Sequence, residues 1–247
     1  MTDPPYFDFV HYSELSDFFF AWLSPVLRGD TPCFDRADSS HEGEVQDRDP
    51  ETFATKIARV FVECYRVLKT DGILAFTFHH SKPEGWLAIY RALANSGFIV
   101  TTAHPMKAEM SVGNPKAAAK EPINLDAILV CRKKDAVPSV SCDVSKAARD
   151  ESAQLMARFT KIGRHLSRGD RFVITASQVL HHASVGGVGE ESVLTLLKEA
   201  HKRCHENESS EQRVAVLTPP SAATGGRPSS KTPAVQQELF DSSATQR

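Results

Sequence analysis

The stretch Ile73-Leu74-Ala75-Phe76-Thr77-Phe78 is an almost unbroken apolar run of strand length. A strand with one wet face alternates apolar and polar residues, whereas a strand covered on both faces of a parallel sheet reads as a continuous apolar run. The run therefore predicts a buried strand in a parallel sheet. It is followed directly by His79-His80-Ser81-Lys82. The carboxyl ends of strands in such sheets face the ligand crevice, so these polar residues are candidates for a site.

Helical patterns flank this strand on both sides. Apolar residues recur every three or four positions from Phe53 to Leu68, behind the helix-start signal Asp49-Pro50. A second helix is predicted over 83–95, further strands over 98–102 and 125–131, and a loop over 110–122. This order of elements predicts an α/β fold, the C-terminal half of a doubly wound, Rossmann-like sheet.

The remaining segments differ in composition. A helix is predicted over 13–27, and it is expected to be buried because its aromatic residues cover more than one face. The acidic segment 28–49 is predicted to be a solvated loop. Beyond the α/β segment 1–135, we expect a small helical region over 136–205, with two or three helices. Residues 206–247 are rich in Ser, Pro, Thr, Gly and Gln and are predicted to be a disordered tail.

Composition narrows the function classes. The 247 residues carry 29 Lys and Arg against 31 Asp and Glu, a net charge of −2, so nucleic-acid binding would need a local site or a partner. No apolar run is long enough to span a membrane, and residues 1–6 show no secretory signal, so no membrane partner is expected. The five widely spaced cysteines favour a reducing cytoplasm over a disulfide framework or a zinc knuckle.

The tetrapeptide Asp3-Pro4-Pro5-Tyr6 carries the sharpest chemical signal. The amino nitrogen of adenine is a poor nucleophile because its lone pair is delocalised into the ring. The carboxylate of Asp3 and the backbone carbonyl of Pro4 can each accept one of its N–H bonds, and Pro5 holds these acceptors in place before the substrate arrives. Tyr6 offers a flat face on which a flipped-out base can stack. The alternative is a proline turn followed by a surface aromatic residue.

The tetrapeptide resembles the catalytic motif of amino-group methyltransferases that use S-adenosylmethionine, in the aspartate form typical of DNA adenine N6-methylation. Three further blocks extend the resemblance, at 11–20, 65–72 and 76–83. Together they make the chain, from Asp3 to about Lys134, similar to a family of large prokaryotic adenine-specific DNA methylases whose full-length members carry an additional N-terminal domain of unknown function. The resemblance implies a DNA adenine N6-methyltransferase, with S-adenosylmethionine as cofactor and DNA as substrate. It implies a catalytic role for Asp3, Pro4, Pro5 and Tyr6.

The S-adenosylmethionine site would be incomplete in this chain. Such a site needs a Gly-rich turn after the first strand and an acidic residue after the second, and the sequence offers neither. In the resembled family the cofactor-binding half precedes the motif. We therefore expect a C-terminal catalytic fragment, inactive without a complementary N-terminal methyltransferase segment. Two alternatives stay open: methylation of amino groups in RNA or protein, and a non-catalytic remnant or partner-binding subunit.

Further substrate-binding candidates lie after two of the strands. His79, His80 and Lys82 are predicted to line the rim of the active site, with helix capping by Ser81 or Lys82 as the alternative. In the resembled methylases, the loop after the second strand lies near the active site. Lys107, Lys116 and Lys120 are therefore candidate phosphate contacts, with a solvated loop as the alternative.

The other notable polar and sulfur-containing residues are assigned no chemistry. The pair His181-His182 lies in or after a predicted helix, beside the glycine-rich stretch 186–189, which is interpreted as a loop. Cys64 and Cys131 fall on apolar stripes and are predicted to be core residues. No metal site is expected.

Overall fold

The fold is taken from a computed structural model. It describes residues 2–5, 7, 12–41, 43–108, 123–138 and 142–206. The loop predicted over 110–122 and the predicted tail, apart from Glu206, lie outside the described residues. Within those residues, no helix combines the length and the apolar character needed to cross a membrane.

The fold is mixed α/β, and among the described residues three strands form one antiparallel sheet: β1 (Leu74–Phe78), β2 (Phe98–Lys107) and β3 (Leu125–Lys133). Their order is β1-β3-β2, and β3 is antiparallel to both neighbours. The three predicted strands are therefore present, but the prediction that they pair in parallel is wrong. β1 and β2 run in the same direction, as two strands joined by a crossover helix should, and the chain then returns as β3 between them.

A fourth stretch of chain pairs with the outer edge of β1. Thr2 forms an isolated parallel bridge with Phe76. Its N–H donates to the carbonyl of Ala75 at 3.0 Å, and its own carbonyl accepts from the N–H of Thr77 at 3.2 Å. The residues after Thr2 therefore leave the sheet at the end where β1 also finishes.

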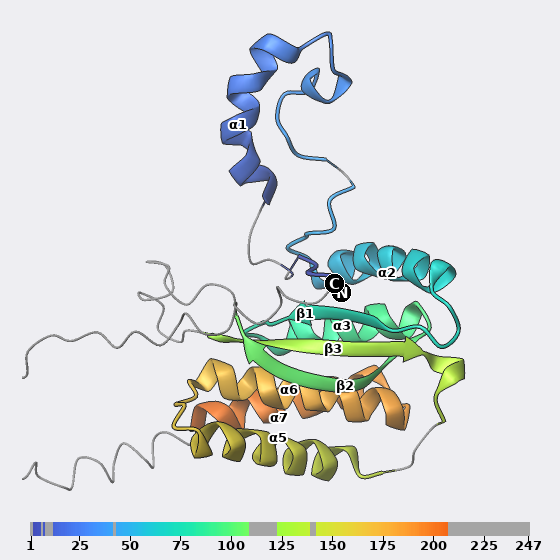
Figure 1. The fold of residues 1–247 in the computed structure, drawn as a ribbon, viewed down its shortest axis with the longest axis vertical. Coiled ribbons are helices and arrows are strands. Elements are labelled where there is room, and N and C mark those ends of the chain that lie inside the picture. The colour runs from blue at the N-terminus through green and yellow to red at the C-terminus, as the bar shows by residue number, and fades with distance from the viewer. Residues whose placement is uncertain are drawn as a thin grey trace, which may run out of the picture. The chain divides into compact units, whose positions relative to one another are not determined.

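One face of the sheet is covered by helices (Figure 1). Helix α2 (Pro50–Val67) starts at its N-cap Asp49, whose side chain accepts from the N–H of Thr52 at 2.8 Å. Helix α3 (Pro83–Asn95) follows β1. Rings on alternate positions of β1 meet these helices: Phe76 packs on Phe61 of α2, and Phe78 packs edge-on to Trp86 of α3. These rings, all at most 2% exposed, form the centre of the core.

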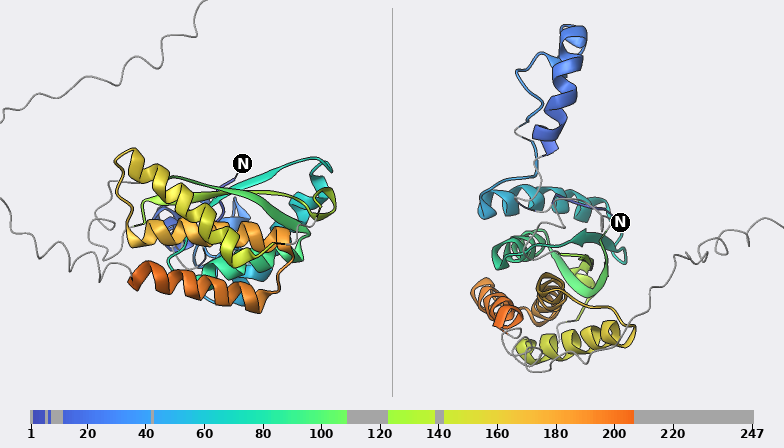
Figure 2. Two further views of the ribbon diagram at one scale, coloured as in Figure 1. Left: turned by 90° about the horizontal axis from the view of Figure 1, so that it is seen from below. Right: turned by 90° about the vertical axis from the view of Figure 1, so that its left-hand side faces the viewer.

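Three helices complete the described chain: α5 (Val144–Lys161), α6 (Arg168–Gly186) and α7 (Glu190–Glu206). This confirms the prediction of two or three helices after the sheet. α6 lies between α5 and α7 and packs on β2, where the Gln178 amide donates to the carbonyl of Ala103 at 3.0 Å (Figure 2). The pair His181-His182 lies inside α6, which continues to Gly186 and stops where Gly187 adopts a φ of +63°. Residues 187–189 then form the loop that the glycine-rich stretch predicts.

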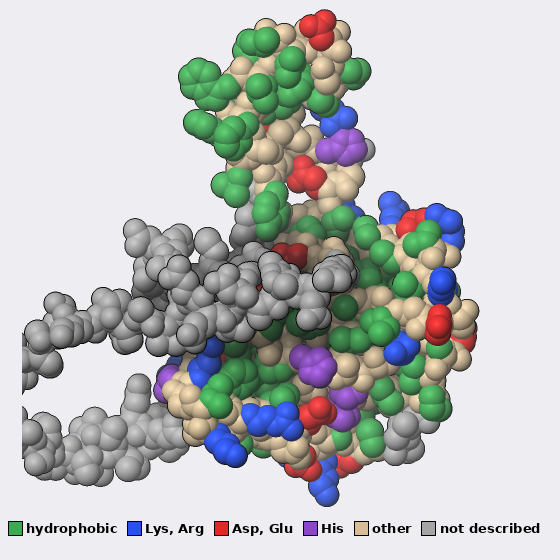
Figure 3. All heavy atoms as spheres, in the orientation of Figure 1, with side chains coloured by type: hydrophobic (Ala, Val, Ile, Leu, Met, Phe, Trp, Pro, Cys, Tyr) green, Lys and Arg blue, Asp and Glu red, His purple; other side chains and the backbone are tan. Residues whose placement is uncertain are grey.

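Two short 3-10 turns, Pro32–Phe34 and Lys134–Ala136, and helix α1 (Tyr12–Leu27) account for the rest. α1 forms over the predicted range, but the expectation that it is buried is wrong: Phe18 and Phe19 are each 65% exposed and Trp22 is 72% exposed. Figure 3 shows the hydrophobic side chains gathered on its surface. The loop after α1 is tied to it by Ser39, whose N–H donates to the Asp17 carboxylate at 2.7 Å.

Candidate functional site

Four polar side chains gather at the carboxyl end of β1: Asp3, Thr77, His79 and Asp126. The pairing of Thr2 with β1 puts Asp3 beside the last residues of that strand. Thr77 and His79 share one face because they are two residues apart on an extended chain. Asp126 joins them from β3, since Phe78 pairs with Ala127 in the antiparallel register.

The Asp3 carboxylate is held by the sheet and reaches solvent. The hydroxyl of Thr77 donates a hydrogen bond to Oδ1 of Asp3. Thr77 is buried, whereas Asp3 is exposed and the following Pro4 and Pro5 are half-buried. The two prolines fix φ in the chain that leaves the strand. A carboxylate in this position is oriented by a buried hydroxyl and can accept further hydrogen bonds from a ligand. Tyr6 lies outside the described residues.

His79 and Asp126 form a buried pair next to it. Nδ1 of His79 lies 2.5 Å from Oδ1 of Asp126, and the two side chains are only 6% and 8% exposed. A carboxylate this close fixes both the ring orientation and the tautomer, with the proton on Nδ1 when the imidazole is neutral. Sequence reasoning missed Asp126. The available signal was a single acidic residue within the apolar run of β3, because a carboxylate is rarely buried there without a partner.

His80 points elsewhere and is packed into the fold. Its Nδ1 accepts from the backbone N–H of Lys82 at 3.0 Å, its carbonyl accepts from the Trp86 indole at 2.9 Å, and its ring packs edge-on to Phe7. Burial lowers the pKa of His80 below its usual value. The ring lies so close to Gly85 that a Cβ there would come within 2.5 Å of it. These contacts match a role in shaping the β1–α3 loop rather than in lining an exposed rim.

The candidate lysines take different positions. Lys82 is exposed and occupies the N-cap position of α3, where its side chain makes no capping hydrogen bond. Lys107 is exposed at the end of β2 and pairs with Leu125, so it lies at the end of the sheet that holds Asp126 and His79. Lys116 and Lys120 lie outside the described residues.

A pocket of about 490 Å³ opens beside the motif. Pro5 lines one side, and residues of α1 and of the loop that follows it, including Ser16 and Ser39, line the other. Its volume falls in the range typical of small-molecule sites. Pro5 thus places this open hollow two residues along the chain from the exposed carboxylate of Asp3.

The carboxyl end of the strands therefore carries three groups that could contact a ligand. They are the exposed carboxylate of Asp3, the fixed imidazole of His79 and the cation of Lys107 at the end of β2. Comparisons with protein-family models, with curated proteins and with solved structures find no match for this chain.

Proposed function

We propose that this chain is the catalytic segment of an S-adenosylmethionine-dependent DNA adenine N6-methyltransferase. The observation that carries the proposal is the position of Asp3. Asp3 follows Thr2, which forms a parallel bridge with β1, and its carboxylate is exposed and is oriented by Thr77, two residues before Pro5 at the edge of a pocket. Ligands of open α/β sheets bind at the carboxyl end of the strands.

Methyl transfer to the adenine amino group requires two hydrogen-bond acceptors held at fixed positions. The Asp3 carboxylate and the Pro4 carbonyl each accept one N–H of the adenine amino group, which draws its nitrogen towards tetrahedral geometry and turns its lone pair to the methyl donor. Fixed acceptors cost no reorganisation when the reaction occurs. S-adenosylmethionine supplies an electrophilic methyl group, and the amino proton becomes acidic once the nitrogen is alkylated, so no strong base is required. Tyr6 stacks on the flipped base.

The strand directions support half of a doubly wound sheet. Thr2, β1 and β2 all run the same way, and helices make both crossovers between them: α1 and α2 from Thr2 to β1, and α3 from β1 to β2. Parallel strands joined by helical crossovers define that class of fold. β3 is an antiparallel strand inserted between β1 and β2.

A complementary segment is the partner that this half sheet favours. On the face away from Phe76, the apolar side chains of Ala75, Ile128 and Val130 are only half-buried, and His104 is exposed. We propose that a segment bearing the Gly-rich turn covers this face, extends the sheet beyond Thr2 and completes the cofactor site. DNA would then approach the carboxyl end of the strands, where Lys107 and Lys82 are placed to meet phosphates.

His79 would act at the same end of the sheet. Asp126 fixes its ring through Nδ1, so any hydrogen bond to the substrate base or sugar comes from a preset direction. His80 is left out of this set because its ring is packed between Phe7 and Gly85.

The experiment is a reconstitution. The coding DNA upstream of the chain is first searched for a Gly-rich strand–turn–helix segment, in frame or in a neighbouring gene, and the chain is then assayed alone and together with any such segment. DNA, RNA and protein substrates are compared for methyl transfer by mass spectrometry. The proposal predicts N6-methyladenine in DNA from the reconstituted pair and none from the chain alone.

Variants separate the proposal from its alternatives. Asp3→Ala should abolish transfer, whereas Asp71→Ala, an exposed aspartate in the turn before β1, should leave it unchanged. Transfer to RNA or protein but not to DNA would assign another substrate. Methylation by the isolated chain would overturn the requirement for a partner, and equal activity of Asp3→Ala would remove the role of Asp3. If the pair assembles but is inactive with every substrate, the result favours the alternative of a non-catalytic subunit.

A further inference from the structure

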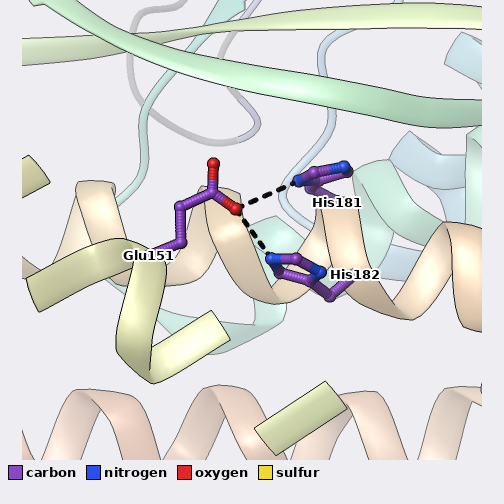
Figure 4. A group of neighbouring side chains, drawn as sticks. All are labelled: Glu151, His181 and His182. Carbon is purple, nitrogen blue, oxygen red and sulfur yellow. Dashed lines mark hydrogen bonds and ion pairs between the residues drawn. The ribbon is translucent and has the colours of Figure 1, made fainter. Parts of the chain in front are cut away.

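Three metal-ligating side chains meet where α5 packs against α6 (Figure 4). Nε2 of His182 lies 2.8 Å from one carboxylate oxygen of Glu151, and Nδ1 of His181 lies 3.7 Å from the same oxygen. One ligand atom from each of the three residues lies within 4.8 Å of the other two. The nitrogen atoms of two imidazoles and one carboxylate oxygen thus converge on a single point.

The helix pair explains the convergence. Neighbouring residues on an α-helix point about 100° apart, so two adjacent histidines can share a ligand only if it lies between their directions. Glu151 of α5 reaches into that sector, and the rings of His181 and His182 are inclined by 32° with centroids 4.4 Å apart. Sequence reasoning could not find this group, since Glu151 is 30 residues from His181.

The hydrogen bonds of the group are incomplete. The contact between His182 and Glu151 is a normal hydrogen bond. Nδ1 of His181, in contrast, is buried and makes no hydrogen bond to any described residue, although the Glu151 oxygen lies just beyond hydrogen-bonding distance. A buried imidazole nitrogen without a partner is costly, and it is an unusual feature in a native fold. A bound cation would satisfy this nitrogen and the carboxylate together.

The distances suit a small transition-metal ion. Zn²⁺ binds imidazole nitrogen and carboxylate oxygen at about 2.0–2.2 Å, so two ligand atoms in tetrahedral geometry lie about 3.3 Å apart. The observed separations of 2.8 and 3.7 Å lie on either side of that value. Each of these two separations would have to change by about 0.5 Å or less to match it.

We propose that Glu151, His181 and His182 form a binding site for a divalent transition-metal ion of the zinc class. Two imidazoles and one carboxylate favour such an ion over Ca²⁺ or Mg²⁺, which prefer oxygen ligands alone. The side chains are 39%, 17% and 19% exposed, so the site opens to solvent, and water can fill the fourth position. Occupancy would link α5 to α6. This inference does not depend on the proposed methyltransferase function.

The experiment titrates the full chain with Co²⁺ and with Zn²⁺. Co²⁺ reports its own ligands through visible absorption, and dialysis with metal analysis gives the Zn²⁺ stoichiometry. The site predicts one ion per chain and a cobalt spectrum of nitrogen and oxygen ligands, without the charge-transfer band of thiolate ligation. By mass action, Zn²⁺ should also raise the thermal midpoint of the wild-type chain.

Matched variants locate the ion. His181→Asn with His182→Gln removes both imidazoles, and Glu151→Gln removes the anionic ligand while keeping the shape and polarity of the side chain. His165→Asn, an exposed histidine between α5 and α6, is the control. The double variant should lose saturable binding and the thermal shift, Glu151→Gln should bind more weakly, and the control should match the wild type.

Three results would overturn the site: no binding by the wild type, a thiolate charge-transfer band, or equal binding by the wild type and the double variant. Should circular dichroism show that the double variant is unfolded, Glu151→Gln and the single variant His182→Gln decide the question. Wild-type affinity in both of these would refute the proposal.

Discussion

Replacing Gly85 with alanine tests how the loop after β1 is packed. A Cβ at this position would lie 2.5 Å from Cγ and Nδ1 of the His80 ring. Ordinary contacts begin at 3.4 Å, so the ring would have to move by about 0.9 Å, the difference between the two distances. The ring has little room to do so, because His80 is 5% exposed, accepts from the N–H of Lys82 and packs on Phe7.

Two effects of opposite sign decide the outcome. Alanine inside a helix is favoured over glycine by about 1 kcal/mol. Overpacking a rigid site costs about 1–3 kcal/mol, and displacing His80 from the Lys82 N–H costs about 1 kcal/mol more. We expect the unfavourable terms to win, so that Gly85→Ala lowers the free energy of unfolding by about 2 kcal/mol.

A double-mutant cycle isolates this contact. Urea unfolding is followed by circular dichroism for the wild type, Gly85→Ala, His80→Ala and the double variant. Once His80→Ala has removed the ring, the Cβ of residue 80 at 3.0 Å is the close contact that remains, so Gly85→Ala should cost much less than in the wild type. An equal loss of stability in both backgrounds, or no loss in the wild-type background, would refute the reasoning.

Three further predictions concern other parts of the core. Burial raises the pKa of the Cys131 thiol far above its usual range, so this cysteine should resist alkylation in the native chain while the exposed Cys33 reacts; mass spectrometry showing native Cys131 modified early would contradict this. Burial lowers the pKa of His80 below the value of 6.5 expected in the unfolded chain, so protons bind the unfolded state more readily. The free energy of unfolding should therefore decline as the pH falls from about 7 to about 5, less steeply in His80→Gln, and equal slopes would exclude this contribution. Tyr90→Phe should cost about 1 kcal/mol in urea unfolding, because the hydroxyl donates to the carbonyl of Val188 at 2.5 Å; an unchanged midpoint would argue against that bond.

Local patterns predicted the elements of the sheet and the first helices. The stripe from Phe53 to Leu68 became α2, and the apolar run before His79 became β1. These predictions hold because helical and extended periodicity each act over a few residues. The direction of β3 was not predictable in this way, because all three strands are apolar and composition does not record the direction of a partner strand.

The prediction that α1 is buried is wrong for a physical reason. α1 carries an aromatic surface typical of a buried helix, yet Trp22 and Phe18 remain exposed among the described residues. Hydrophobicity predicts that a surface favours burial, but it does not identify the segment or partner that would bury it.

The candidate site was predictable in part. Asp3 could be singled out because its chemistry lies within one tetrapeptide. The pair His79 and Asp126 joins positions 47 residues apart, and it required the antiparallel register of β1 and β3. The packing of His80 against Gly85 likewise depends on how the β1–α3 loop folds back on α3.

The most direct test of the central claim is the single-turnover rate of methyl transfer to adenine in DNA by the reconstituted enzyme. Asp3→Asn keeps the size of the side chain but replaces one acceptor oxygen with a donor. If the carboxylate holds the amino group for attack, the rate constant should fall by at least about 100-fold while DNA affinity changes little. Asp71→Asn should react at the wild-type rate. A wild-type rate for Asp3→Asn would contradict the account.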